Sequence, residues 1–195
     1  EEDNVFLSPF SISTALGMLQ LGAEANTELE MSNLLGVFQD DSYAWHNGQG
    51  ALVQEFDLGN NCDYSLSVAN KAYFQTGYDF NIDFVEELSL YYGSALGELD
   101  FSRDPEAARQ EINGWVSGRT NQRIPELFTS GQIVSSTKMV LTNAVYMDAP
   151  WKNAFDPSNT FTTEFNRADG SVTTVEMMTS LETPFRIGYQ NDFQI

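Results

Sequence analysis

The chain has 195 residues, of which 42% are hydrophobic and 13% are aromatic, a composition typical of a folded globular protein. It is strongly acidic: 9 Lys and Arg residues face 28 Asp and Glu residues, giving a net charge of −19, and no basic residue precedes Lys71. Nucleic acids and anionic membranes are bound by basic patches, so the charge argues against both as partners.

Cysteine content and hydropathy further narrow the class of protein to which the chain can belong. Cys62 is the only cysteine, so the chain can form neither an intrachain disulfide nor a thiolate metal cluster. The compartment stays undecided on this evidence, although we favour an extracellular or secreted location. No apolar run approaches the roughly 18 residues that a membrane span requires. The chain starts at Glu1 without a signal peptide, as a processed or truncated product would.

The segment "NVFLSPFSISTALGMLQLGA" predicts a short strand followed by a helix. The strand-like run passes through Val5 and Leu7, and Ser8 and Pro9 are typical of a helix N-cap and first turn. Gly22 closes the helix. The apolar residues that we expect to form its buried face are Ile12, Ala15, Leu16 and Leu19.

A second helix is predicted from a capping box formed by Thr27 and Glu30, and it ends at Gly36. The stretch 39–50 is polar and weakly patterned, so we expect a loop there. The following "ALVQEF" is interpreted as a short helix.

The middle of the chain contains both predicted strands and predicted helices. "YSLSVANKAYF" has period two and predicts a strand, and "ALGELDF" is also expected to be extended. Between them, Asn81 or Asp83 can cap a helix. Asp104 and Pro105 begin the clearest helix of the chain, which Gly118 ends. The residues expected on the buried face of the first strand are Leu66, Val68, Ala72 and Phe74.

The stretch "MVLTNAVYM", residues 139–147, predicts a central strand buried on both faces, with Asn143 in its middle. A buried amide without a partner costs about 1–3 kcal/mol. We therefore expect other polar side chains to meet Asn143 in the fold.

The last part of the chain is rich in Thr, Phe and Val. "ADG" at 168–170 predicts a hairpin, with strands at 172–175 and 185–189. Because helices and strands are clustered along the chain, an α+β fold is favoured over a doubly wound sheet.

No pattern in the chain predicts catalysis. His46 is the only histidine and lacks a nucleophile-elbow partner sequence, so we interpret it as a surface-loop residue. One histidine and one cysteine cannot supply the usual zinc ligands. The acid pairs at 40–41 and 86–87 are typical of solvated faces. We therefore predict no enzyme, no catalytic residue, no cofactor and no metal, although an unrelated hydrolase stays open as a distant alternative.

Taken together, "NVFLSPFSISTALGMLQLGA", "INGWVSGRTNQRIPELF" and "MVLTNAVYMDAPWKNAFDPSNTF" resemble the serpin family of protease inhibitors, in collinear order over nearly the whole chain. The resemblance implies a fold in which helices pack on a large mixed sheet, with two smaller sheets. It implies suicide-type inhibition of a serine or cysteine protease, by insertion of a reactive loop into the main sheet. The alternative is a non-inhibitory serpin fold used for binding, chaperoning or storage.

The resemblance also implies roles for individual residues. Ser8, Ser11 and Asn143 match the family's shutter, beneath the point where the sheet parts, and the serine hydroxyls would then meet the Asn143 amide, together with a family histidine that this chain does not contain. Trp151 matches the breach, where the loop first enters. The alternative interpretations are an ordinary helix cap for Ser8 and a core aromatic for Trp151.

By the same resemblance, residues 1–195 form an incomplete single serpin-like domain, in which the first helix and the C-terminal half with the reactive loop and its scissile bond are absent. The expected partners are a target protease and a C-terminal serpin fragment that completes the fold. Heparin is not expected as a partner, because the segment that matches the family's heparin-binding helix carries Asp40, Asp41 and Glu55 and no basic residue.

Overall fold

The computed structural model describes residues 7–37, 41–58, 64–93, 95–180, 189–190 and 193–194. The chain divides into two compact units, Leu7–Ala149 and a second unit that contains Pro150–Ile195. Each unit is described by itself. The expected strand through Val5, the cysteine at position 62 and most of the expected strand at 185–189 lie outside the described residues.

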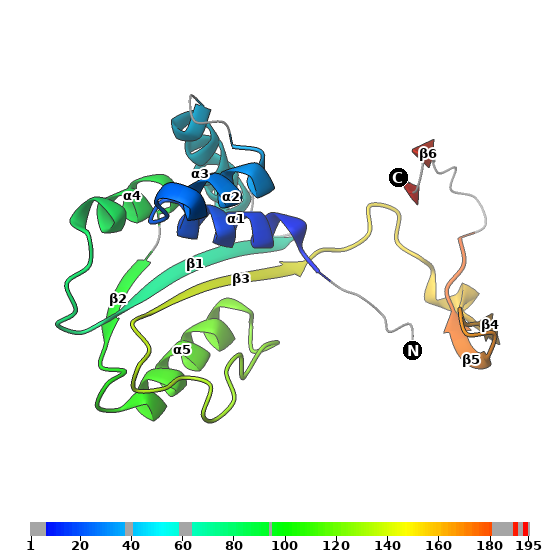
Figure 1. The fold of residues 1–195 in the computed structure, drawn as a ribbon. Coiled ribbons are helices and arrows are strands. Elements are labelled where there is room, and N and C mark those ends of the chain that lie inside the picture. The colour runs from blue at the N-terminus through cyan, green and yellow to red at the C-terminus, as the bar shows by residue number, and fades with distance from the viewer. Residues whose placement is uncertain are drawn as a thin grey trace. The chain divides into compact units, whose positions relative to one another are not determined.

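The first unit is a mixed sheet with helices on both sides (Figure 1). The sheet has three strands in the order β2-β1-β3, and β1 runs parallel to β2 and antiparallel to β3. In Figure 1, α1 lies on one side of the sheet and α5 on the other. The elements are α1 (Pro9–Gln20), α2 (Ala25–Leu35), α3 (Ser42–Leu58), β1 (Ser65–Gln75), α4 (Ile82–Tyr92), β2 (Ala95–Leu99), α5 (Pro105–Arg119) and β3 (Met139–Asp148).

The predicted helix starts at Ser8, Asn81 and Asp104 are confirmed. Each of these side chains accepts a hydrogen bond from a backbone N–H of the first turn that follows it. At the end of α2, Gly36 takes a left-handed conformation with φ 68°. Such caps satisfy backbone groups that the helix itself cannot pair, and they are set by neighbouring residues alone.

Two helical predictions are wrong. α2 begins at Ala25, and its N-cap residue Glu24 makes no side-chain capping bond, so the predicted start of the helix at Thr27 does not hold. α3 forms where a loop was expected in its first half. The residues of α3 that are buried are His46, Gly50 and Val53. They have helical spacing, but a histidine and a glycine do not give an apolar periodicity.

The buried face of α1 also differs from the prediction. Ile12 and Leu19 are 51% and 41% exposed. The α1 residues that are buried instead are Thr14, Gly17, Met18 and Gln20. The polar members of this face have local or tertiary partners, because Thr14 donates its hydroxyl hydrogen to the carbonyl oxygen of Phe10 at 2.8 Å.

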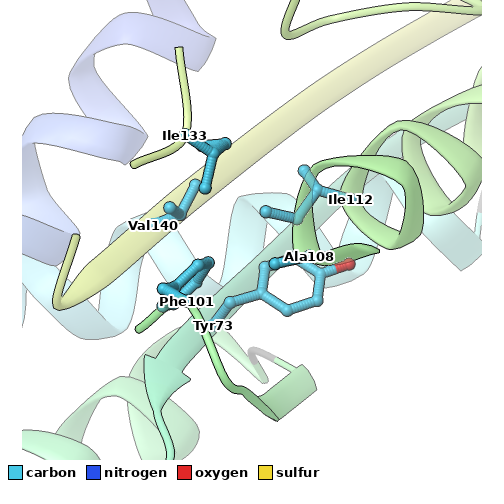
Figure 2. Packing of buried hydrophobic residues seen from close by; sticks show 6 residues of the cluster. All are labelled: Tyr73, Phe101, Ala108, Ile112, Ile133 and Val140. Atoms are coloured by element: carbon cyan, nitrogen blue, oxygen red, sulfur yellow. The ribbon is translucent and has the colours of Figure 1, made fainter. Parts of the chain in front are cut away.

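The side of the sheet that faces α5 carries an apolar cluster (Figure 2). The cluster is made of Tyr73, Phe101, Ala108, Ile112, Ile133 and Val140. Asn113 on α5 holds the segment beside it, because its amide nitrogen donates to the carbonyl oxygen of Phe128 at 2.8 Å and its oxygen accepts from the N–H of Phe128 at 2.9 Å. The predicted helix is confirmed as α5, although it runs through Arg119, past the predicted end at Gly118.

The second unit contains a hairpin. The antiparallel strands β4 (Phe161–Asn166) and β5 (Val172–Met177) are joined through Gly170, which has φ 80°, so the hairpin predicted from "ADG" is confirmed. The remaining elements of this unit are η2 (Pro157–Asn159), β6 (Tyr189–Gln190) and β7 (Phe193–Gln194).

Candidate functional site

Asn143 has a partner, and that partner is another asparagine. The two residues stand directly opposite each other in the register of β1 and β3, and the Asn143 side-chain nitrogen donates to Oδ1 of Asn70 at 2.6 Å. Asn143 is half-buried, whereas Asn70 is only 7% exposed. The buried amide expected in β3 is therefore matched by a polar group from the neighbouring strand.

The asparagine pair lies on the side of the sheet opposite to α5. Side chains alternate along a strand, so Asn70 shares a face with Ala72 and Phe74, and Asn143 shares a face with Leu141. These apolar neighbours pack with Met18 of α1 and with residues of α4. The pair therefore belongs to the side that is covered by α1 and α4.

The pair is incompletely satisfied. The side-chain nitrogen of Asn70 is buried and has no hydrogen-bond partner among the described residues. An unpaired buried donor costs about 1–3 kcal/mol, so this position holds a local source of instability. The sequence offered a signal for it: the period-two pattern of β1 puts Asn70 on the same face as Ala72 and Phe74.

Ser8 and Ser11 lie at the start of α1, and α1 packs against β3. Ser8 Oγ accepts two hydrogen bonds from Ser11, one from its backbone N–H at 3.2 Å and one from its hydroxyl at 3.0 Å. Ser8 is thus a helix cap. The expectation that a serine hydroxyl would meet Asn143 is not met, because the Asn143 amide nitrogen donates to Asn70. The physical reason is that Asn70 stands directly opposite in the ladder.

Trp151 belongs to the second compact unit. Its side chain is 72% exposed, so its interpretation as a core aromatic is wrong. Its ring meets the ring of Phe155 edge to face, with centroids 6.3 Å apart. This contact explains the spacing of the tryptophan and phenylalanine that the sequence singled out, and the breach role of Trp151 stays a prediction.

Two other kinds of site are absent from the described part of the chain. Among its residues, no group of three or more His, Cys, Asp and Glu side chains could hold a metal ion. None of its helices is both long and apolar enough to span a membrane. The surface-loop interpretation of His46 is wrong, since this side chain is 1% exposed inside α3.

Comparison with known protein families matches residues 1–195 to the family described as Serpin (serine protease inhibitor). The leukocyte elastase inhibitor of Bos taurus is 37% identical over 193 residues, which cover 98% of this chain and 49% of that protein. Serpin B8 of Homo sapiens is 36% identical over 195 residues, which cover 98% of this chain and 51% of that protein. The chain therefore belongs to the serpin family.

Solved structures agree with this assignment. Ovalbumin from emu (Dromaius novaehollandiae) superimposes with a TM-score of 0.82 at 26% identity, over 95% of this chain and 49% of that one. AtSerpin1 of Arabidopsis, in its native stressed conformation, gives a TM-score of 0.78 at 30% identity, over 91% of this chain and 45% of that one. The predicted serpin-like α+β fold is confirmed, and the chain spans about half the length of the relatives it matches.

The family is described as one of serine protease inhibitors and not of enzymes. The prediction that the chain is not an enzyme is confirmed on that ground.

Proposed function

We propose that the protein to which this chain belongs inhibits a serine or cysteine protease once, by inserting its cleaved reactive loop into the main sheet beside β3. The observation that carries the proposal is the match of residues 1–195 to the family described as serine protease inhibitors. Within the described residues, β3 lies at one end of the β2-β1-β3 order. A terminal strand presents N–H and C=O groups that can pair with an incoming strand. New ladder bonds and buried apolar area would then stabilise the loop-inserted form.

The remainder of the domain is part of the proposal. Residues 1–195 form part of a single serpin domain, and a C-terminal serpin segment supplies the reactive loop and its scissile bond. This division is supported by the length of the relatives, of which the chain covers about half. The target protease is set mainly by the residue at that bond. Relatives called leukocyte elastase inhibitor make elastase the first protease to test.

In this proposal the shutter consists of Ser8, Ser11 and Asn143, joined by Asn70. A neutral hydrogen bond contributes only about 0.5–1.5 kcal/mol net to stability. The bond between the two asparagines can therefore hold the strands in register and still be replaced by another bond when the sheet rearranges. The unpaired nitrogen of Asn70 makes that exchange easier, because a rearrangement that gives it an acceptor gains a bond. Trp151 is assigned to the breach on the family resemblance alone.

The test uses the full-length protein that carries this sequence. It is incubated with elastase, trypsin and chymotrypsin, and the products are separated by SDS gel electrophoresis. Inhibition predicts an SDS-stable complex of serpin and protease, together with a loop-cleaved form whose melting temperature is raised. Cleavage of the loop without a complex, and without a rise in melting temperature, would refute the inhibitory mechanism.

A second candidate function is binding, chaperoning or storage on a non-inhibitory serpin fold. The similarity to emu ovalbumin favours it, because ovalbumin is a non-inhibitory serpin. The same incubation separates the two candidates, since a non-inhibitory protein is cleaved as a simple substrate. Small residues in the hinge of the reactive loop would support inhibition, and bulky or charged residues there would support the second candidate.

The hydrogen bond between Asn70 and Asn143, which we call the latch, is tested separately by Asn143→Ala. The variant loses the bond that holds β3 in register with β1, on the edge of β3 away from the proposed insertion, so we expect β3 to be held less firmly and the protein to polymerise faster on mild heating. Met147→Ala is the matched control, because Met147 lies on the same strand and is 71% exposed. Equal melting temperatures and equal polymerisation rates in the two variants would rule out a latch at Asn143.

A further inference from the structure

His46 lies at the centre of a buried hydrogen-bond chain that the proposed inhibitory mechanism does not use. Its Nε2 lies 2.7 Å from Oε1 of Gln20, and its Nδ1 lies 2.7 Å from the hydroxyl oxygen of Tyr92. The amide nitrogen of Gln20 in turn donates to the hydroxyl oxygen of Ser32 at 3.2 Å. One continuous chain of polar side chains therefore joins α1, α2, α3 and α4.

These contacts place a hydrogen on Nε2 of the imidazole and leave Nδ1 able to accept a hydrogen bond when the ring is neutral. An amide oxygen can only accept, so Nε2 of His46 carries the hydrogen that it donates to Gln20. Nδ1 is then the acceptor for the hydroxyl hydrogen of Tyr92. Burial raises the pKa of Tyr92, so its hydroxyl stays protonated and remains able to donate. The chain is fully satisfied only when His46 is neutral.

Aromatic rings and the backbone of α1 crowd these hydrogen bonds. The Trp45 ring packs edge to face on His46 with centroids 5.0 Å apart, and the Tyr91 ring lies 5.5 Å away. On α1, a Cβ added to Gly17 would lie 2.6 Å from the Tyr92 hydroxyl oxygen. A second proton on Nδ1 would point at the Tyr92 oxygen and force that hydroxyl to turn away from it.

Among the described residues, burial is the one cause of the shift in the pKa of His46, and no carboxylate contributes to it. α1 has no charged residue along its length. α4 contributes the rings of Tyr91 and Tyr92. The charge of Glu87 on that helix interacts with Tyr91. The ring of Tyr43 on α3 also contacts the Tyr91 ring. α2 reaches the chain through Ser32, and its Glu30 accepts a bond from Asn26 at an exposed position. The only charged residue of β1, Lys71, places its ammonium 5.9 Å from the Trp115 ring on the opposite side of the sheet.

The hydrogen-bond chain crosses a junction between helices. α1 packs mainly against α2 and β3, and α3 packs mainly against α4 and β1, while Met18 and Phe10 of α1 also contact α4 and α3. His46 and Tyr92 belong to the second group, and Gln20 and Ser32 belong to the first. We propose that His46 is an acid-sensitive link between these two groups of helices, which we call the tie. When His46 is neutral, its hydrogen bonds hold α1 and α2 to α3 and α4, and when it is protonated, it releases them.

The sign of the pH dependence follows from the burial. Desolvation lowers the pKa of His46 from 6.5 to about 4. Between these values the unfolded chain binds a proton that the folded chain excludes, so the tie is fully effective above pH 6.5 and weakens as the pH falls toward 4. The expected loss is up to about tenfold in the folding equilibrium constant per pH unit within that window.

The first experiment measures urea unfolding of the full-length protein at pH values from 7 to 4.5, for the natural sequence and for His46→Gln. The natural protein should lose stability relative to His46→Gln as the pH falls, by up to about tenfold in the equilibrium constant per pH unit. Asn47→Ala, an exposed neighbour on α3, is the matched control and should keep the natural pH slope. Equal slopes for the natural protein and His46→Gln would overturn the proposal.

The second experiment tests the release itself by hydrogen exchange at pH 7 and pH 4.5, corrected for intrinsic rates. Amides of α1 and α2 should lose about tenfold or more of their protection at the lower pH in the natural protein, whereas those of α5 should not. Unchanged protection of α1 would overturn the release even if His46 titrates.

Tyr92→Phe covers the case in which His46→Gln does not fold. It keeps the imidazole and removes the hydrogen that holds Nδ1 in its neutral state, so the His46 titration followed by NMR should move up toward the ordinary value. An unchanged midpoint would overturn the tie.

Discussion

On the side of the sheet that faces α5, β1 and β3 contribute Tyr73 and Val140 to an apolar cluster, whereas on the side that faces α1 the same strands carry the Asn70–Asn143 pair (Figure 2). Both sides belong to the same ladder. The side that faces α5 is stabilised by the removal of apolar area from water. This contribution is roughly proportional to the buried area and has no preferred direction. The other includes directional bonds that can be exchanged without leaving a cavity. We infer that the face toward α5 keeps the strands rigid, whereas the face toward α1 allows them to rearrange.

The helices that cover the two sides differ in the same way. α5 places Ala108 and Ile112 in the apolar cluster. α3 buries a histidine and a glycine, and the histidine bonds to side chains of other helices, whereas the buried Asn113 of α5 bonds to the backbone at Phe128. Substitutions on the two sides should therefore differ both in their cost and in the property that they change.

The largest effect is expected from Ile112→Ala. Ile112 is fully buried between α5 and the sheet, and truncation of such a side chain costs about 2–5 kcal/mol because it leaves a cavity. Urea unfolding of the full-length protein measures the loss. Ile112→Val should cost only about 0.5–1.5 kcal/mol. Leu90→Ala on α4, at a position 69% exposed, is the control and should change stability little. Similar losses for Ile112→Ala and Leu90→Ala would contradict the apolar assignment of this face.

The next largest effect is expected where the backbones of α3 and α4 approach each other closely, on the other side of the sheet. A Cβ added to Gly50 of α3 would lie 1.7 Å from the carbonyl oxygen of Tyr91, so Gly50→Ala forces α3 away from α4. Such overpacking costs about 1–3 kcal/mol or more.

Gly48→Ala in the same helix has open space around it and should instead stabilise the protein by about 0.5–1 kcal/mol, because alanine is the better helix former. Thermal unfolding of both variants checks the pair. A stabilising Gly50→Ala would show that α3 does not pack on α4 as described.

The same contrast explains which parts of the fold the sequence predicts. The starts of α1, α4 and α5 follow from Ser8, Asn81 and Asp104, because a cap is a contact between residues a few positions apart. The strand β1 follows from its alternation. α3 was missed in its first half because its buried face contains His46 and Gly50, and only the contacts of distant helices make those residues interior.

The candidate site was predicted in part for the same reason. The unusual position of Asn143 in an apolar strand is visible in the sequence, and it correctly indicates a polar partner. The identity of that partner depends on the register between β1 and β3, which is a long-range property. Asn70 could be found only by asking which polar residue interrupts the other strand's buried face.

A smaller effect is expected at the asparagine pair. Asn70→Ala removes the acceptor for Asn143 and should cost about 1–2 kcal/mol, at the lower end of the range because Asn143 is half-buried and Asn70 already has one unpaired nitrogen.

The double substitution Asn70→Val with Asn143→Val replaces both partners by apolar groups. It should be nearly neutral or stabilising in urea unfolding. The double variant loses the same bond as Asn143→Ala, so, if the pair restrains the strands, it should also anneal a synthetic reactive-loop peptide faster than the natural protein. An equal or slower annealing rate would separate the pair from sheet opening.

The smallest effect compares two helix caps, one on each side of the sheet. Ser8 caps α1 and Asp104 caps α5, so Ser8→Ala and Asp104→Ala should each lower stability by about 1 kcal/mol. Stability alone does not distinguish them. If Ser8 also belongs to the shutter, only Ser8→Ala should raise the polymerisation rate on mild heating beyond what its lost stability explains. Equal rates in two variants of equal melting temperature would leave Ser8 as a cap and confine the latch to the strands.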